Sequence, residues 1–329
     1  MRLAVRIALA AGLALLIALI LHQGSAILIP LARAGRVLLW LVPLHALPIL
    51  LDSLGWRTLI ARVKETRVGT LFWIASVREA INRLLPAANI GGELVGIRLL
   101  AETGIDGVTA AASVTTEVVL TVFSQYLFVA LGVACLLRLT HTVQLTDGVL
   151  IGLGASLPVV VLLAVLIRYG SIFERMERLA VRVLGEERLG FLAGQSASLD
   201  AAIRELFADR PRLLTTMAWQ VTAMVSGSLE TWLALRWLGS PVTFGAAVAL
   251  ESLTMTVRNF VFLVPAGLGV QEASLVGFGA LLGVNGDLAL ALSLVKRMRE
   301  ILFGVPALAS WYWVEGRREL QHVRGSGKY

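Results

Sequence analysis

The chain has 329 residues, of which 57% are hydrophobic and only 16% charged, and its mean hydropathy is +0.81. Soluble globular proteins carry about a quarter charged residues, so this composition excludes a disordered chain, a soluble enzyme of this length and, with Cys135 as the single cysteine, a secreted disulfide scaffold. The net charge of +7 does not indicate a nucleic-acid partner, because Lys and Arg accumulate in the cytoplasmic loops of membrane proteins. We therefore expect an all-α polytopic membrane protein.

Six stretches are apolar over about the 20 residues that a helix needs to cross a bilayer. We expect full transmembrane helices at residues 7–21, 37–56, 109–137, 149–167, 213–238 and 288–314. Two other apolar stretches, residues 69–103 and 243–285, are each interrupted near the middle by Pro and Gly and carry several ionisable side chains. A continuous spanning helix would not be interrupted in this way, so each stretch predicts a re-entrant helical hairpin that enters and leaves on one face.

The distribution of Lys and Arg favours a topology with both termini in the cytoplasm. The first apolar stretch is then a retained span and not a cleaved signal peptide. In this arrangement only Arg33, Arg36 and Arg138 lie in outer loops, whereas most of the other basic residues outside apolar segments lie inside, as the positive-inside rule requires.

A polar linker at residues 171–212 would lie on the cytoplasmic side. In its second half Leu199, Ile203, Leu206 and Phe207 recur at helical spacing, and Pro211 opens the next span. This pattern predicts an amphipathic helix. Packing of the linker explains it more simply than a regulatory role does.

The two interrupted stretches resemble each other at an offset of 179 positions. Leu84-Leu85-Pro86-Ala87 corresponds to Leu263-Val264-Pro265-Ala266, and in both copies a Glu follows the Pro after seven residues, as Glu93 and Glu272. A Val-Arg pair precedes each Pro, as Val77-Arg78 and Val257-Arg258, one position out of register. Chance similarity between Ala-rich and Gly-rich segments is the alternative explanation.

Three full spans separate the two copies, so the second copy would be inserted upside down relative to the first. We expect one membrane domain with a first repeat at about residues 69–137 and a second at about 243–314. Inverted repeats with broken helices are typical of transporters, in which the breaks lie near the bilayer midplane. The residues expected to shape the two re-entrant tips are Pro86, Gly91, Gly92, Pro265, Gly267, Gly269 and Gln271.

Many ionisable residues fall within the apolar segments, where each isolated charge would cost about 3 kcal/mol or more. The acids are Asp52, Glu79, Glu93, Glu117, Glu230, Glu251, Glu272 and Glu300, and the bases are Arg78, Arg83, Arg236, Arg258, Lys296, Arg297 and Arg299. The acids and bases are nearly equal in number, so pairing between them must offset much of this cost. Helical spacing predicts the pairs Glu79 with Arg83 and Lys296 with Glu300.

Such charges either form purely structural pairs or mark a polar pathway. The residues that we expect to form a substrate pathway are Arg78, Glu93, Arg258, Glu272, Lys296, Arg297, Arg299 and Glu300. Several bases near the second tip would hold a phosphate or carboxylate, while an apolar tail stays between the helices or in lipid. An amphipathic lipid is the expected cargo, although a proton-coupled small anion would use the same residue types.

The sequence gives little support for catalysis. It contains no HExxH, no CxxC pair, no P-loop and no GxSxG, and its four His lack the spacing of metal ligands. We therefore expect neither a cofactor nor a metal. Transfer chemistry within the membrane by Glu and Arg stays open as an alternative.

Four segments of the chain resemble the flippase-like transmembrane region of lysylphosphatidylglycerol synthases. They are Leu84 to Glu93, Leu250 to Leu253 with Val257-Arg258, Val264 to Glu272, and Ala291 to Glu300. Within that superfamily they are most similar to the HpnL-type proteins associated with hopanoid biosynthesis, and the resemblance covers nearly the whole chain. It implies a bacterial inner-membrane protein that moves or distributes lipids, with hopanoid-pathway proteins as candidate partners.

The resemblance leaves the cargo open among a hopanoid, a phospholipid and a polyprenyl-phosphate lipid. Lysylphosphatidylglycerol synthases carry a soluble aminoacyl-transferase domain after the membrane region, whereas this sequence stops shortly after its last expected span. We therefore do not expect lipid aminoacylation. The competing functions are an intramembrane lipid-modifying enzyme and a non-transporting scaffold of a hopanoid assembly.

Overall fold

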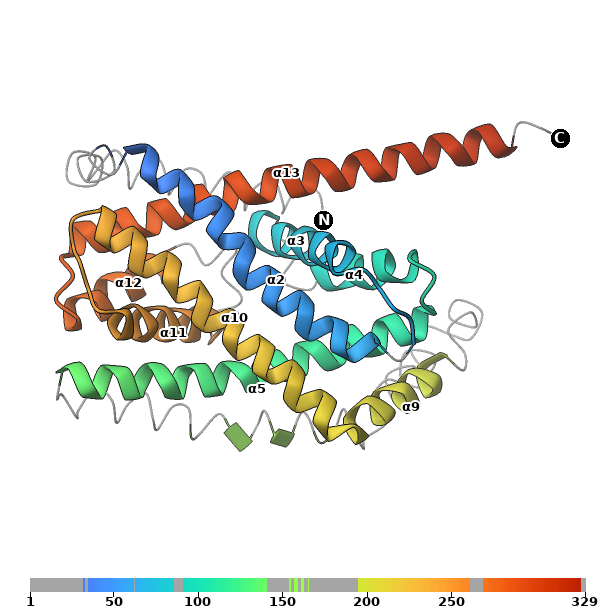
Figure 1. Cartoon of the computed structure of the whole chain (residues 1–329), viewed down its shortest axis with the longest axis horizontal. Helices are drawn as coiled ribbons and strands as arrows, with labels where there is room; N and C mark the ends of the chain where they lie inside the picture. The colour runs from blue at the N-terminus through green and yellow to red at the C-terminus, as the bar shows by residue number, and fades with distance from the viewer. Residues whose placement is uncertain are drawn as a thin grey trace, which may run out of the picture.

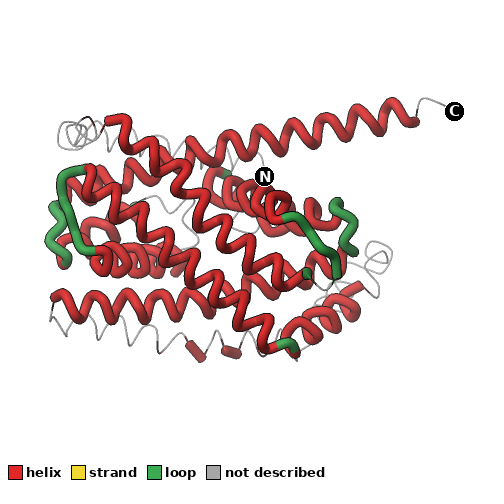
Figure 2. Tube along the Cα trace, in the orientation of Figure 1, coloured by secondary structure: helices red, strands yellow, loops and turns green. Residues whose placement is uncertain are grey.

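The structure is a computed structural model, and it describes residues 35–61, 63–85, 91–140, 195–260 and 269–326 together with a few isolated positions. All regular structure in these ranges is helical, which confirms the expected all-α class (Figure 2). The expected span at 7–21, most of the one at 149–167 and the first half of the linker lie outside the described residues.

The first half of the described chain contains a short helix and four α-helices. They are η1 (Gly35–Trp40), α2 (Leu41–Ile60), α3 (Val68–Leu84), α4 (Gly91–Ala101) and α5 (Gly107–Thr140). The second half contains α9 (Gln195–Ala208), α10 (Arg210–Trp237), α11 (Phe244–Phe260), α12 (Val270–Leu281) and α13 (Gly286–Ser326). Helices α2, α5, α10 and α13 thus occupy four of the six expected spans.

Two helical segments, Leu38–Ile60 and Gly107–Leu139, are long and apolar enough to cross a membrane by length and composition. Helix α13 is longer than the expected span, because no strong helix breaker follows residue 314 and the helix continues to Ser326. This helix extends beyond the body of the molecule towards the C-terminus (Figure 1).

Each interrupted stretch contains two described helices, α3 and α4 in the first and α11 and α12 in the second. Helix α3 ends at Leu84 because Pro86 disfavours helical geometry at the residue before it, and Leu85 is extended, with φ −108° and ψ 142°. Helix α12 begins after Gly269, whose φ of 78° is readily adopted only by glycine. The remaining tip positions Pro86, Pro265 and Gly267 lie outside the described residues.

The two stretches also share their layout at the offset of 179 positions seen in the sequence. Helices α4 and α12 begin at residues 91 and 270, and helices α5 and α13 begin at residues 107 and 286. The turns between them contain Gly104 and Gly283, again 179 positions apart, and both have a positive φ, 90° and 76°. The structure therefore repeats a unit of helix, break, short helix, glycine turn and long helix.

Packing joins each repeat to the other. Helix α3 packs on α13 and α11 packs on α5, while α2 and α10 lie side by side along their length in the middle of the molecule (Figure 1). Glycines allow these close approaches. A Cβ on Gly132 of α5 would collide with Ser252 of α11, and a Cβ on Gly304 of α13 would lie 2.7 Å from Leu84 Cδ1 of α3.

Two apolar cores lie at opposite ends of α2. One surrounds Leu38 and Leu41 and includes residues of α10 to α13, and the other surrounds Trp56, Leu59 and Ile60 and includes residues of α3 to α5. The middle of α2 separates them and is polar, because His45 and Asp52 lie between the two cores.

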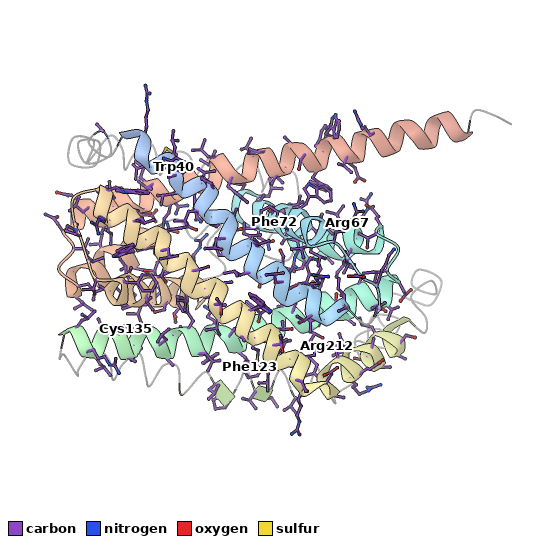
Figure 3. All side chains as sticks on the ribbon, in the orientation of Figure 1. Trp40, Arg67, Phe72, Phe123, Cys135 and Arg212 are labelled. Atoms are coloured by element: carbon purple, nitrogen blue, oxygen red, sulfur yellow. The ribbon has the colours of Figure 1, made fainter. Side chains whose placement is uncertain are left out.

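Helix α9 lies against α5 and confirms the expected amphipathic helix in the linker. Ile203 and Phe207 pack on Ala112 and Val119, with Phe123 beside them (Figure 3). The Asp209 side chain accepts a hydrogen bond from the Arg212 backbone N–H at 3.3 Å and so caps the start of α10. In this structure the apolar face of α9 is therefore used for packing.

Candidate functional site

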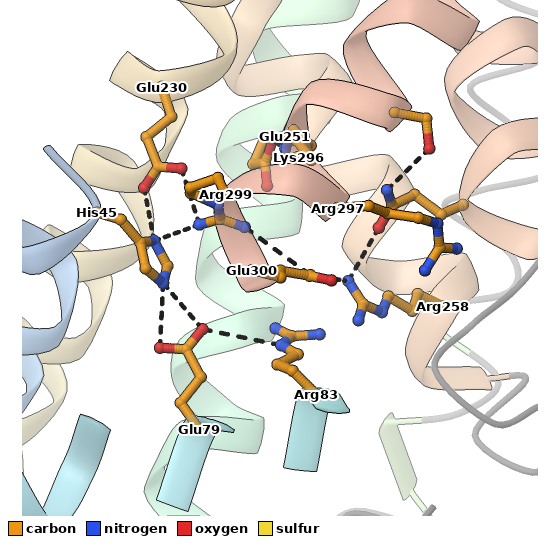
Figure 4. A network of polar contacts seen from close by, with 12 residues as sticks. His45, Glu79, Arg83, Glu230, Glu251, Arg258, Lys296, Arg297, Arg299 and Glu300 are labelled. Atoms are coloured by element: carbon orange, nitrogen blue, oxygen red, sulfur yellow. Dashed lines mark hydrogen bonds and ion pairs between the residues drawn. The ribbon is translucent and has the colours of Figure 1, made fainter. Parts of the chain in front are cut away.

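His45 lies at the centre of a network that joins four helices (Figure 4). Its Nδ1 lies 2.8 Å from Glu230 Oε1 of α10 and also contacts Arg299 Nη1 of α13. Its Nε2 lies 3.1 Å from both carboxylate oxygens of Glu79 on α3. The ring of Phe303 meets the imidazole edge to face at 5.0 Å, so the histidine is held from every side.

The network continues from Arg299 towards the second repeat. Arg299 pairs with Glu230 at 2.8 Å and approaches Glu300 at 3.8 Å. Arg258 of α11 lies 3.4 Å from Glu300 and donates a hydrogen bond to Gln271 Oε1 of α12 at 3.0 Å. Gln271 is therefore not part of a loop, because it lies in the first turn of α12 and is buried.

The predicted pair of Glu79 with Arg83 is present at 3.8 Å, but the predicted pair of Lys296 with Glu300 is wrong. Lys296 instead pairs with Glu251 of α11, which also accepts a hydrogen bond from the Thr231 hydroxyl at 2.5 Å. Helical spacing could not predict this contact, because the partner comes from another helix.

Glu272 combines two structural roles. Its Oε2 accepts a hydrogen bond from the Gly269 backbone N–H at 2.7 Å and so caps α12. Its Oε1 accepts hydrogen bonds from Arg297 Nε and from the Ser293 hydroxyl, both at 2.9 Å. Arg297 and Glu272 thus hold α12 against α13.

A cavity of about 280 Å³ opens where α2, α3, α5, α10, α11, α12 and α13 meet. Part of its wall is apolar, with Ile49, Phe128 and Met224, and part is polar, with Gln220 and Gln271. The ionisable residues that line it are His45, Asp52, Glu79, Arg83, Glu230, Glu251, Arg258, Lys296, Arg299 and Glu300. Of the expected pathway residues, this cavity brings together Arg258, Lys296, Arg299 and Glu300.

The charges of the cavity nearly cancel. Among the described lining residues five carboxylates face four permanent cations and one histidine. Lys296, Arg258 and Arg299 each contact a carboxylate. The expected excess of bases around an anion is therefore absent from this lining, because tertiary packing supplies Glu230, Glu251 and Glu300 as partners.

A second polar cluster surrounds Arg78 in the first repeat. Arg78 donates to Glu117 Oε2 at 2.7 Å and to Glu93, and its guanidinium lies 4.8 Å from the centre of the Trp56 ring. Asn82 adds a cap, because its Oδ1 accepts a hydrogen bond from the Gly92 backbone N–H at 3.0 Å. Gly91 and Gly92 thus begin α4 and do not form a loop.

This second cluster does not itself line the cavity, although Asp52 interacts with both Arg78 and Glu117 and does line the cavity. Neither Arg78, Glu93 nor Glu117 lines it. Arg78 and Glu117 are only 8% and 3% exposed. The structure therefore places the expected pathway residues in three groups: Arg78 and Glu93 in this cluster, Glu272 and Arg297 between α12 and α13, and Arg258, Lys296, Arg299 and Glu300 on the cavity.

Comparison with known families agrees with this architecture. Residues 3–307 match the family described as the lysylphosphatidylglycerol synthase TM region. The chain belongs to this family. It is therefore a membrane protein, and the match covers its transmembrane region and no catalytic domain. No curated protein and no solved structure gave a match.

The sequence identified Glu230 and Glu251 as intramembrane charges but did not assign them to the pathway, and it gave His45 no role. In this member of the lysylphosphatidylglycerol synthase transmembrane family, His45 and Arg299 are 254 positions apart in the sequence. The local signal that pointed to these residues was the presence of an ionisable side chain inside an expected span, which by itself suggests a polar contact.

Proposed function

We propose that the protein moves an amphipathic lipid between the leaflets of the bacterial inner membrane. The observation that carries the proposal is the cavity of about 280 Å³, which joins an apolar wall to a dense set of charges within a family of transmembrane regions. Ionisable side chains inside a membrane protein are costly and usually mark a pathway for polar groups.

The size of the cavity suits part of a lipid. Pockets that enclose a drug-sized ligand measure roughly 300–1,000 Å³, so a cavity of about 280 Å³ has room for a headgroup and not for the chains. The chains would stay in the bilayer while the headgroup exchanges contacts with the internal ion pairs.

The repeated architecture supports alternating access. We infer that the two repeats are inverted, with both termini cytoplasmic and with the breaks after α3 and before α12 at the ends of re-entrant hairpins. The reciprocal packing of α3 on α13 and of α11 on α5 is what such a pseudo-twofold arrangement requires. Rocking of one repeat against the other would then expose the cavity to each side in turn.

The proposed cargo is a hopanoid, a phospholipid or a polyprenyl-phosphate lipid. A near-neutral cavity with both donors and acceptors can bind the hydroxyl groups of a hopanoid. A phosphate would need Arg258 or Arg299 to release a carboxylate.

The proposal is tested with purified protein in proteoliposomes that carry either a fluorescent anionic phospholipid or a labelled hopanoid. The assay measures how fast label in the inner leaflet becomes accessible to a membrane-impermeant quencher. We expect movement of at least one lipid by the wild type, and a loss of about tenfold or more in Arg299→Ala and Arg258→Ala.

Arg98→Ala is the matched control, because Arg98 is a 60% exposed side chain that pairs with Glu102 and Glu315 away from the cavity. It should move lipid at the wild-type rate. Equal rates in all three variants would contradict the site, and no movement of either lipid by folded protein would contradict the function. A new covalent lipid product would instead indicate an enzyme.

A further inference from the structure

The Nδ1 atom of His45 has two partners that it cannot satisfy at once. Glu230 Oε1 is an acceptor 2.8 Å away, and Arg299 Nη1 is a donor in contact with the same nitrogen. A protonated Nδ1 donates to Glu230, whereas an unprotonated Nδ1 accepts from Arg299. The protonation state of the ring therefore selects which of these two bonds exists.

The other ring nitrogen is bonded in the same way in both states. Nε2 lies 3.1 Å from both oxygens of Glu79. A carboxylate is an acceptor only, so Nε2 carries the proton in the neutral ring and keeps it in the imidazolium. Glu79 thus fixes the tautomer, and the variable proton belongs to Nδ1.

The two alternatives tie α2 to different helices. With the ring protonated, α2 is bonded to Glu230 on α10, and Arg299 keeps its contact with the other oxygen of Glu230 at 2.8 Å. With the ring neutral, α2 is bonded to Arg299 on α13, and the lone pair of Nδ1 faces an oxygen of Glu230. One proton therefore shifts an attachment of α2 between α10, which precedes the second repeat, and α13, which ends it.

The charge of the cavity depends on the same proton. Around the ring lie Arg83 from α3, Glu251 and Arg258 from α11, Lys296 and Glu300 from α13, and Asp52 from α2 itself. Glu117 of α5 faces Arg78 instead. We count these six groups together with Glu79, Glu230 and Arg299, all in their charged forms. The described lining then carries one excess negative charge when His45 is neutral and none when His45 is protonated.

We propose that His45 is the proton-binding group that couples lipid movement to a proton gradient, an inference that rests on the proposed function. Histidine is the side chain whose ordinary charge change falls between about pH 5 and pH 8, and His45 is the single histidine among the described side chains. The ring takes up a proton on Nδ1 from water on one side of the membrane and releases it to water on the other. The lipid is chemically unchanged, and the pH difference supplies the free energy.

The experiment imposes a pH difference across the proteoliposomes of the lipid-movement assay and measures the steady-state ratio of labelled lipid between leaflets. With one proton coupled to one lipid, a difference of one pH unit shifts this ratio by up to tenfold. His45→Gln should abolish the shift, because an amide does not titrate. Arg98→Gln, which alters the exposed pair with Glu102 and Glu315, should retain it.

The outcomes separate the two proposals. Lipid movement by the wild type with the same ratio in the presence and absence of the gradient overturns proton coupling and leaves lipid transport standing. An absence of lipid movement overturns both proposals. A shift that persists in His45→Gln assigns the coupling to another group and overturns the role of His45.

A second measurement does not depend on transport. Nitrogen-15 NMR of labelled histidine in lipid nanodiscs reports the protonation of each ring nitrogen, with His45→Gln used to assign the His45 signals. We expect Nε2 to stay protonated throughout and Nδ1 to change state over a titration of the folded protein from acid to alkaline pH. A ring that remains in one state across this range, in protein shown to be folded, contradicts the proposal.

Discussion

The closed cluster around Arg78 lies within the first repeat, whereas the open cavity around His45 is lined by α2, α10 and helices of both repeats, and the two differ in chemistry. Glu93 and Glu272 stand at the same position in the first turns of α4 and α12, which suits the positive end of each helix. Glu93 is held by Arg78 from the preceding helix, and Glu272 by Arg297 from the following one. Arg258, the counterpart of Arg78 in the sequence pattern, is thereby left to face the cavity.

The equivalent positions even carry opposite charges. At the offset of 179 positions Glu79 corresponds to Arg258, and Glu117 corresponds to Lys296. The first repeat uses Glu117 to close its cluster with Arg78, whereas the second uses Lys296 to reach Glu251 on the cavity wall. The comparison teaches that one helical layout can hold either a closed ion cluster or charges that line a cavity, depending on which helix supplies the partner.

The largest expected effect is on stability, in Arg78→Met. The substitution leaves Glu93 and Glu117 without their shared cation, and breaking a buried pair in this way costs about 3–5 kcal/mol. The free energy of unfolding, measured by denaturation in mixed detergent micelles, should fall by this amount. A change below about 1 kcal/mol would show that the cluster is hydrated and not closed.

Gly92→Ala should have the second-largest effect on the free energy of unfolding. A Cβ at this position would clash with the backbone oxygen of Arg78 and lie 2.6 Å from Asn82 Oδ1, so the contact between α3 and α4 must open. Overpacking of this kind costs about 1–3 kcal/mol, measured as above. Gly277→Ala is the matched control, because nothing lies within 4 Å of its added Cβ. Equal stability of the two variants would mean that α4 is not fixed against α3.

Arg258→Met should be much milder than Arg78→Met although the two arginines are counterparts. Arg258 is 16% exposed, it lies on the cavity, and Glu300 keeps Arg299 at 3.8 Å after the substitution. We expect a loss of about 1 kcal/mol of unfolding free energy, together with the loss of lipid movement. If Arg258→Met destabilises the protein as strongly as Arg78→Met does, the distinction between the two clusters is wrong.

The smallest effect belongs to Arg98→Ala. Its pairs with Glu102 and Glu315 are exposed, and such pairs contribute about 0.2–1 kcal/mol. This variant sets the baseline for loss of an arginine outside both clusters. A loss as large as that of Arg78→Met would indicate that Arg98 fixes the position of α13 on α4.

The bounds of the helices in the two interrupted stretches could be predicted from the sequence because their determinants are local. Pro86 ends α3, glycines begin or cap the short helices, and long apolar runs give the long helices. The pair of Glu79 with Arg83 was predictable for the same reason, since both residues lie on one face of α3.

The partners within the cavity could not be predicted in this way. Lys296 has Glu300 one turn away, yet tertiary packing brings Glu251 of α11 into contact with it. The contacts of His45 depend on α2 lying along α10 and on Arg299 and Phe303 coming from α13, and no local pattern encodes that packing. Sequence periodicity therefore identified the charged residues, and tertiary packing decided which of them meet.

The central claim, that a lipid headgroup passes through the cavity around His45, is tested most directly by filling that cavity. Gly227 of α10 lines it and has nothing within 4 Å of an added Cβ, so Gly227→Phe places a ring in the open space. Gly277→Phe makes the same change at an equally open position that does not line the cavity. We predict that lipid movement in proteoliposomes is lost in Gly227→Phe and retained in Gly277→Phe. Wild-type rates in both variants, with both proteins folded, would contradict the claim.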